Sequence, residues 1–269
     1  MESHHRDAVY LYCLGRSGLL PDLEGIGVDG NNPLFLHSFQ GLGAVLSTVP
    51  LAEFCGAAAE ERLQDLTWVG PRACRHEEVV EQAARYSPLL PARFGTIFSS
   101  LDGVEALLKT HHDPILKFLD QVTDKEEWSV KGLLDRAKVK EQLFSAQRAN
   151  EADRLASLSP GMRYFQEQHI RSKVEKELNG WLKGVCQEVS AHLGRHAAVS
   201  CERKVLSREV TGMDRDMVLN WAFLVPRKAV ADFRTRIEQA NAEHDRQGLV
   251  FQLSGPWPPY SFCPALELA

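Results

Sequence analysis

The sequence lacks the cysteine, serine and glycine arrangements that mark common metal, redox and hydrolase sites. Its six cysteines are scattered and form no Cys-x-x-Cys pair, so they do not match a zinc or thioredoxin-like motif. The Gly-x-Ser-x-Gly motif and the P-loop are also absent, and both are typical of particular enzyme classes. We therefore expect reduced, mostly buried thiols of a cytoplasmic protein, with no catalytic residue, cofactor or metal.

Long apolar runs are missing as well. No stretch approaches the roughly 18 apolar residues that suggest a membrane-spanning helix, and the apolar run 8–14 is too short and wrongly flanked for a signal peptide. The net charge of −5 and the pI near 6.1 argue against nucleic acid or an anionic membrane as the main partner. We expect neither kind of partner.

Two motifs are present only in part. Gly25-Ile26-Gly27-Val28-Asp29-Gly30 matches the dinucleotide fingerprint, but that site needs a strand directly before the loop and a helix directly after it. Here the predicted strand ends well before Gly25 and Asn31-Asn32-Pro33 follow, which favours a plain glycine loop. His76-Glu77-Glu78-Val79-Val80 begins like a zinc-protease helix, but Val80 stands where the second histidine ligand belongs.

The hydrophobic pattern predicts an α+β chain of two domains. For residues 1–121, a smaller α+β unit, we expect strands and helices joined by a loop over 15–33. The expected strands are 8–14, 34–38 and 43–49, the last two joined in a hairpin by Gln40-Gly41-Leu42-Gly43. The expected helices are 51–66, 72–85 with Pro71 at its start, and 101–119.

For residues 122–269 the predicted order is β-α-α-β-β-α-β. The expected elements are a strand at 127–134, helices at 135–158 and from Ser159 onward, strands at 198–206 and 216–225, a helix at 227–246 and a strand at 249–253. Ser159 can cap the second helix, with Pro160 at its first position. Without one added helix this is the βαββαβ order of a ferredoxin-like domain. The strand 216–225 is apolar on both faces: one face, assigned to the core, carries Met217, Leu219, Trp221, Phe223 and Val225, and the other carries Val218, Ala222 and Leu224. We expect the helix 135–158, the first domain or a partner to cover this second face.

Two further segments are candidates for binding. Arg93 and Phe94 lie on an extended passage between two predicted helices, where an arginine either pairs internally or faces a ligand. The tail Gly255–Phe262 holds three prolines and three aromatic residues, so it is stiff and not helical. We expect Trp257 and Tyr260 to dock on their own protein.

Six segments taken in order resemble the gas vesicle protein F/L family: His76–Glu81, Leu90–Phe98, Glu127–Lys131, Ser159–Tyr164, Asn220–Val225 and Leu253–Phe262. The Arg-Phe-Gly-Thr segment at 93–96 and the tail are the most specific of these. Two positions depart from the family pattern: Ala92 stands where a larger aliphatic residue is common, and Trp221 where an alanine is expected.

The resemblance implies an accessory protein of gas vesicles, the hollow protein shells that give microbes buoyancy. Such a protein supports assembly in the cytoplasm and at the vesicle by binding the hydrophobic main shell protein and other accessory proteins. The family pattern includes no catalytic residues, which predicts that the protein is not an enzyme. The candidate partner-binding residues are Arg93, Phe94, Val218, Ala222, Leu224, Trp257 and Tyr260.

An alternative stays open. Ferredoxin-like domains also form regulatory proteins that bind small molecules, and such a protein would hold a ligand between domains or protomers. Stabilisation of the fold by a metabolite would identify that case.

Overall fold

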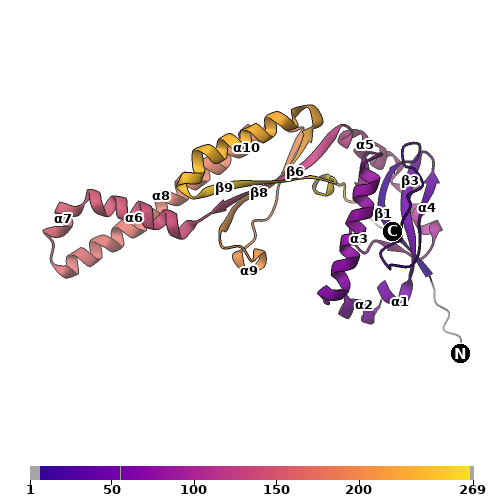
Figure 1. Ribbon diagram of the computed structural model, residues 1–269, viewed down its shortest axis with the longest axis horizontal. Helices are drawn as coiled ribbons and strands as arrows, with labels where there is room; N and C mark the ends of the chain where they lie inside the picture. The colour runs from indigo at the N-terminus through magenta and orange to yellow at the C-terminus, as the bar shows by residue number, and fades with distance from the viewer. Residues whose placement is uncertain (1–6, 55, 267–269) are drawn as a thin grey trace. The chain divides into compact units, whose positions relative to one another are not determined.

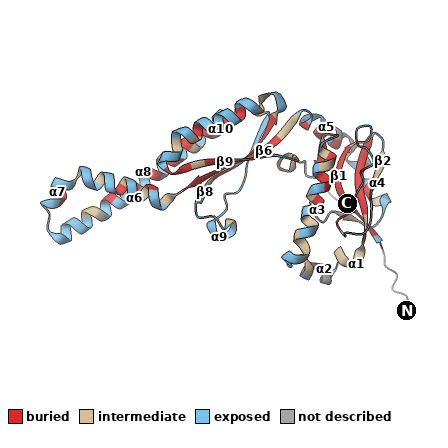
Figure 2. Ribbon diagram, viewed as in Figure 1, coloured by how far each residue is buried: buried red, intermediate tan, exposed pale blue. Residues whose placement is uncertain are grey.

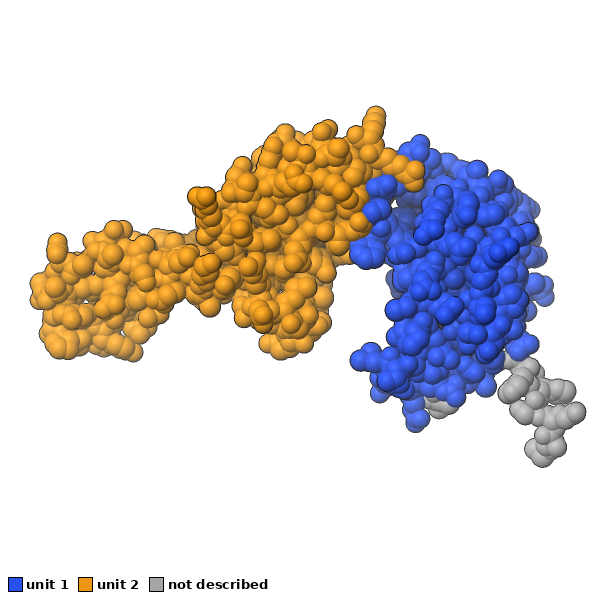
Figure 3. Space-filling view, viewed as in Figure 1, with its two compact units in different colours: residues 1–126, 256–269 blue, residues 127–255 orange. Residues whose placement is uncertain are grey.

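The computed structural model describes residues 7–54 and 56–266. The chain divides into two compact units, residues 1–126 with 256–269, and residues 127–255 (Figure 3). The sequence suggested one boundary between residues 121 and 122, with the tail in the second domain. The tail instead groups with the first unit because Tyr260 forms a hydrogen bond with Glu77, which belongs to that unit.

In the residues that the structure describes, the first unit is built on an antiparallel sheet of five strands that differ in length (Figure 1). Its strands are β1 (Asp7–Arg16), β2 (Leu34–Phe39), β3 (Leu42–Pro50), β4 (Leu89–Pro91) and β5 (Ile97–Phe98), in the order β2-β3-β1-β4, with β5 also paired to β1. The hairpin between β2 and β3 turns at Gln40 and Gly41, whose φ angles of 47° and 84° suit the primed turns of tight hairpins. β1 is buried along nearly its whole length.

The described part of the first unit also contains five helices, three before β4 in the chain and two after it. They are α1 (Leu51–Phe54), α2 (Ala57–Arg62), α3 (Leu66–Ala84), α4 (Leu101–Thr110) and α5 (His112–Val122), and both α3 and α5 contact β1. None of the helices in the described ranges combines the length and apolarity needed to cross a bilayer.

Three of the predicted helix boundaries are wrong. The single helix expected over 51–66 is broken, and α3 begins at Leu66 because the side chain of Asp65 accepts a hydrogen bond from the Thr67 N–H at 2.9 Å. Pro71 therefore lies inside α3, at the loss of one backbone hydrogen bond. The helix expected over 101–119 breaks at His111, since Pro114 cannot continue an α-helix from α4 without a steric clash.

The glycine loop leads into β2 and not into a helix. A Cβ atom added at Gly27 would lie 2.4 Å from Ser47 Oγ and 2.8 Å from the Tyr12 hydroxyl oxygen. Those two side chains are buried and joined by a hydrogen bond of 2.8 Å, and the same Tyr12 hydroxyl accepts the Val28 N–H at 2.8 Å. The loop thus packs its backbone against β1 and β3, which requires glycine at position 27.

We expect Gly27→Ala to lower the free energy of unfolding by about 2–3 kcal/mol, because the added methyl group has no room beside two buried strands. Gly18→Ala is the matched control, since nothing lies within 4 Å of a Cβ at that position, and it should change stability by less than about 1 kcal/mol. Urea unfolding of both variants measures the difference. Equal effects of the two substitutions would contradict this account of the loop.

The second unit holds an antiparallel sheet with the strand order β7-β8-β6-β9. Its strands are β6 (Lys125–Leu134), β7 (Val199–Glu202), β8 (Asp216–Pro226) and β9 (Leu249–Trp257); its helices are α6 (Arg136–Asn150), α7 (Ala152–Ala156), α8 (Pro160–Gly194), α9 (Arg208–Thr211) and α10 (Val230–His244), with short 3-10 turns at Arg227–Ala229 and Asp245–Gln247. β9 runs on through Trp257, so the first part of the aromatic tail is strand. A third 3-10 turn, Tyr260–Phe262, follows in the first unit.

One face of this sheet carries the main core of the unit. The C-terminal half of α8 and helix α10 pack on it, and Leu219, Phe223 and Val225 of β8 point into the same cluster, as the alternation in β8 predicted. Figure 2 shows this contrast between buried strands and exposed outer helix surfaces.

The N-terminal half of α8 pairs with α6 and α7 instead of the sheet. We call this helical extension, residues 136–177, the arm. It has its own small cluster of buried side chains, Phe144, Leu155, Ile170 and Val174. The predicted helix 135–158 is interrupted at Glu151, whereas Ser159 caps α8 as predicted, with its Oγ accepting the Met162 N–H.

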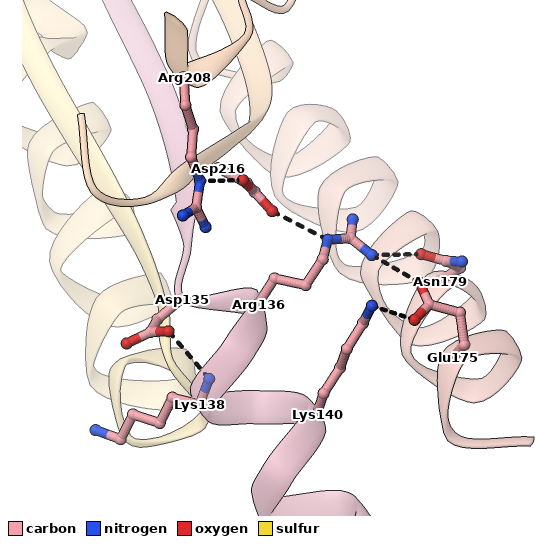
Figure 4. Close-up of polar contacts among 8 residues, drawn as sticks. All are labelled: Asp135, Arg136, Lys138, Lys140, Glu175, Asn179, Arg208 and Asp216. Atoms are coloured by element: carbon pink, nitrogen blue, oxygen red, sulfur yellow. Dashed lines mark hydrogen bonds and ion pairs between the residues drawn. The ribbon is translucent and has the colours of Figure 1, made fainter. Parts of the chain in front are cut away.

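A charged network fixes the root of the arm to the sheet of its own unit (Figure 4). Arg136 at the start of α6 donates to Asp216 on β8 at 3.1 Å, to Glu175 on α8 at 3.2 Å and to Asn179 at 3.0 Å. Arg208 also forms an ion pair with Asp216, and Lys140 forms one with Glu175. Because one guanidinium joins three elements, the network restrains the arm more than separate surface ion pairs would.

Candidate functional site

Three segments that lie far apart in the sequence meet around His76 in the first unit. His76 and Glu77 come from α3, Ala92 from the passage after β4, and Tyr260 from the tail. The Nε2 atom of His76 lies 3.2 Å from the Ala92 carbonyl oxygen and 3.4 Å from the Tyr260 hydroxyl. The Tyr260 hydroxyl donates to Glu77 Oε1 at 2.9 Å. We call these four residues the tail clasp.

The hydrogen bonds determine the tautomer of His76. A carbonyl oxygen can only accept, so Nε2 carries the proton and donates it to Ala92. Nδ1 then accepts from the Tyr10 hydroxyl at 3.0 Å, and the Tyr10 oxygen in turn accepts the Gly95 N–H at 2.9 Å. Both ring nitrogens are engaged, and the imidazole is neutral.

Burial accounts for the charge states at the clasp. His76 is fully buried, and burial lowers its pKa to about 4, opposed by the hydrogen bond to Ala92. Burial likewise raises the pKa of the Tyr260 phenol, with the nearby Glu77 carboxylate adding to the effect. The Glu77 pKa is raised by burial, partly offset by the Tyr260 hydrogen bond. The clasp therefore joins neutral donors to one partly buried carboxyl group.

Aromatic rings hold the Arg93 segment beside the clasp. The Tyr12 ring stacks on His76 at 5.6 Å between centroids, and Phe94 meets the edges of His76 at 6.0 Å and Tyr10 at 6.3 Å. Phe94 is half-buried and acts as an anchor. Arg93 next to it is exposed, and within the described residues its guanidinium forms no ion pair.

The tail residues differ in their exposure. Tyr260 is half-buried and docks on the chain's own first unit, whereas Trp257 is 45% exposed. The Cys263 thiol lies 3.9 Å from the Pro91 carbonyl oxygen. The tail thus runs beside the segment that carries Arg93, and it leaves a large aromatic side chain at the surface.

The sequence suggested that a helix, the first domain or a partner covers the second face of the sheet in the second unit, and side chains on this face are indeed buried. Ala222 and Leu224 are fully buried and Val218 is half-buried. Directly after β7, the Arg203 N–H donates to the Asn220 carbonyl and the Asn220 side chain donates to the Lys204 carbonyl, so the pairing along β8 continues past Glu202. These β8 side chains are covered, and we place no partner on them.

Sequence reasoning missed His76 as the centre of the clasp. It was considered only as a metal ligand, and no group of three or more potential metal-binding side chains is found among the described residues. The available signal was its position in a helical stripe with Val79, Val80 and Ala83, all buried. A histidine in such a stripe is buried and must find hydrogen-bond partners.

Comparison with known proteins gives consistent matches over almost the entire chain. Residues 8–264 match the family described as gas vesicle synthesis protein GvpL/GvpF. Gas vesicle protein L of Streptomyces sp. (strain CB03234) is 27% identical over 96% of this chain and 93% of its own length. Gas vesicle protein L1 of Halobacterium salinarum is 25% identical over 95% and 90%.

A solved structure agrees with these matches in fold. The crystal structure of GvpF from Anabaena sp. PCC7120 superposes with a TM-score of 0.70 at 21% identity, covering 96% of this chain and 99% of that one. The chain belongs to the gas vesicle protein GvpL/GvpF family and has a role in gas vesicle formation.

Proposed function

We propose that the protein supports gas vesicle assembly by binding the hydrophobic main shell protein and other accessory proteins, in the cytoplasm and at the growing vesicle. A subunit with a large apolar surface aggregates unless a partner covers that surface before assembly. The protein would act as that partner. Its second unit, with the strand order β7-β8-β6-β9, would be a ferredoxin-like domain extended by the arm.

The observation that carries this proposal is the surface beside the tail clasp. The two segments that are most specific for the family resemblance, residues 93–96 and the tail, come together there. Arg93 and Trp257 are exposed, and each lies within three residues of a side chain that contacts His76, namely Phe94 and Tyr260. Arginine and tryptophan are the residue types most enriched among the side chains that dominate binding energy. We place the shell-protein contact on Arg93 and Trp257.

We expect the double variant Arg93→Glu, Trp257→Ala to retain at least about tenfold less main shell protein in a pull-down from co-expressing cells. The loss of one binding anchor is commonly worth more than about 1.4 kcal/mol, which is a tenfold change in affinity. Both side chains are exposed, so the fold should survive.

Arg85→Glu, Tyr86→Ala is the matched control, because it makes the same charge reversal and aromatic truncation at exposed positions at the end of α3. It should retain as much shell protein as the unchanged chain. Equal retention of shell protein by both double variants would show that the contact lies elsewhere on the protein.

A further inference from the structure

Within the described residues, the sheet of the second unit has two edge strands, β7 and β9, which differ in length and charge. β7 has four residues, the last of them Glu202, and Arg203 and Lys204 follow directly. β9 has nine residues, and none of them is charged. Short strands and charged side chains commonly protect a sheet edge against pairing with another chain. β9 has neither of these protections.

The hydrogen bonds of β9 show which of its backbone groups face away from the sheet. The Phe251 N–H donates to Asn241 Oδ1 at 2.7 Å, and the Phe251 carbonyl accepts from Asn241 Nδ2 at 2.9 Å. Because both groups are bound to α10, Phe251 faces away from β6. Gly248, by contrast, accepts the N–H of Asp135, the residue directly after β6, at 3.0 Å. Since these directions alternate along a strand, the odd-numbered residues face the open side.

Leu253 is the next residue of β9 on this open side. It lies two residues after Phe251, so its N–H and carbonyl face the same way, and β6 is the only strand beside β9 in the described part of the chain. The Asn241 amide takes the place of a neighbouring strand at Phe251. Glu238 and Arg234, on the same stripe of α10 as Asn241, have opposite charges and leave that stripe without net charge.

An unpaired strand edge is recognised by another extended backbone, which adds a strand to the sheet. The absence of charge from β9 suits a partner segment that is itself uncharged and apolar. The strand ends at Trp257, one of the two residues on which the shell-protein contact is placed above. We infer that an extended, uncharged segment of the main shell protein pairs with β9 from Leu253 onward as an added strand. This inference rests on the proposed function and specifies how the partner is held.

Amide hydrogen exchange resolved to single residues tests the pairing directly. It is measured on the chain alone and on the complex that co-purifies with the main shell protein. The Leu253 N–H should exchange at least about tenfold more slowly in the complex, because it then donates to the backbone of the partner. The Phe251 N–H is the internal control: Asn241 accepts its proton in both samples, so its rate should stay the same.

Two substitutions of Leu253 separate its backbone from its side chain. Leu253→Pro removes the outward N–H without removing a hydrogen bond to β6, and proline is tolerated where an edge strand faces outward. Leu253→Val keeps the N–H and is the matched control for the packing of Leu253 against the core. We expect the proline variant to retain at least about tenfold less shell protein, and the valine variant as much as the unchanged chain. A protected Phe251 N–H confirms that each variant is folded.

Three results would overturn the inference. A complex in which the Leu253 N–H exchanges as fast as in the chain alone, or equal retention by the proline and valine variants, would leave the proposed function standing without this pairing. Slower Leu253 exchange in the chain alone as its concentration rises would assign the edge to a second copy. If the unchanged chain retains no shell protein, the proposed function fails, and the assigned partner with it.

Discussion

Replacing His76 with leucine is expected to lower the free energy of unfolding by about 3 kcal/mol at pH 7.5. Leucine fills much of the buried volume but leaves the Tyr10 hydroxyl proton and the Ala92 carbonyl oxygen without the imidazole partner they have now. Each buried polar group that loses its partner costs about 1–3 kcal/mol. Urea unfolding followed by tryptophan fluorescence measures the loss.

The pH dependence of this difference identifies its cause. The His76 pKa is lowered to about 4 in the folded protein from 6.5, so the unfolded state binds more protons between those values. Stability from the neutral imidazole is therefore complete above pH 6.5 and falls as the pH decreases toward 4. The unchanged protein should lose about 3 kcal/mol over this range, while the leucine variant lacks this contribution.

The gap between the two proteins should accordingly close as the pH falls to about 4. Glu77 is present in both, so its opposite contribution largely cancels in the difference. His169→Leu, a change at an exposed histidine of α8, should leave stability within about 0.5 kcal/mol at every pH. A gap that stays constant with pH would show that His76 contributes through packing alone.

The second large effect is expected at Arg203. Its guanidinium pairs with the Glu127 carboxylate, whose side chain is only 1% exposed. Arg203→Met keeps much of the side-chain length but removes the charge that balances a buried carboxylate, and such losses cost about 3–5 kcal/mol. We expect a loss near the lower value, because Arg203 itself is 34% exposed.

Arg208→Met is the control for that substitution. Arg208 also pairs with a carboxylate, but its own side chain is 43% exposed and that of Asp216 is 29% exposed, so the cost should stay below about 1 kcal/mol. The double variant Glu127→Gln, Arg203→Met should recover part of the loss, because the unbalanced charge is gone. Equal effects at Arg203 and Arg208 would contradict the assignment of a buried charge.

The local parts of the fold follow from the sequence and the long-range parts do not. The hairpin between β2 and β3, the cap at Ser159 and the inward face of β8 were all predicted, because turn geometry, capping and alternation act over a few residues. The break of the expected helix 101–119 at His111 was not predicted, although Pro114 indicates it. Capping by Asp65 overrode the start suggested by Pro71.

The sequence identified the separate segments of the candidate site but not the contacts that bring them together. Arg93 and the tail were recognised as unusual, yet nothing in either segment indicates that both reach His76. The contact from Tyr260 to Glu77 spans most of the chain, and a single sequence gives no periodicity over such distances. The apolar second face of β8 indicated that Ala222 and Leu224 are covered, and both are buried. Which part of the molecule covers them is a tertiary question that the alternation does not answer.

We expect the main shell protein to bind the surface beside the tail clasp. The most direct test is to titrate purified protein into freshly diluted shell protein and to measure how much shell protein stays in the supernatant after centrifugation. We expect saturable retention that needs at least about tenfold more of the Arg93→Glu, Trp257→Ala variant than of the unchanged chain. Retention that is absent, or identical for both proteins, would contradict it.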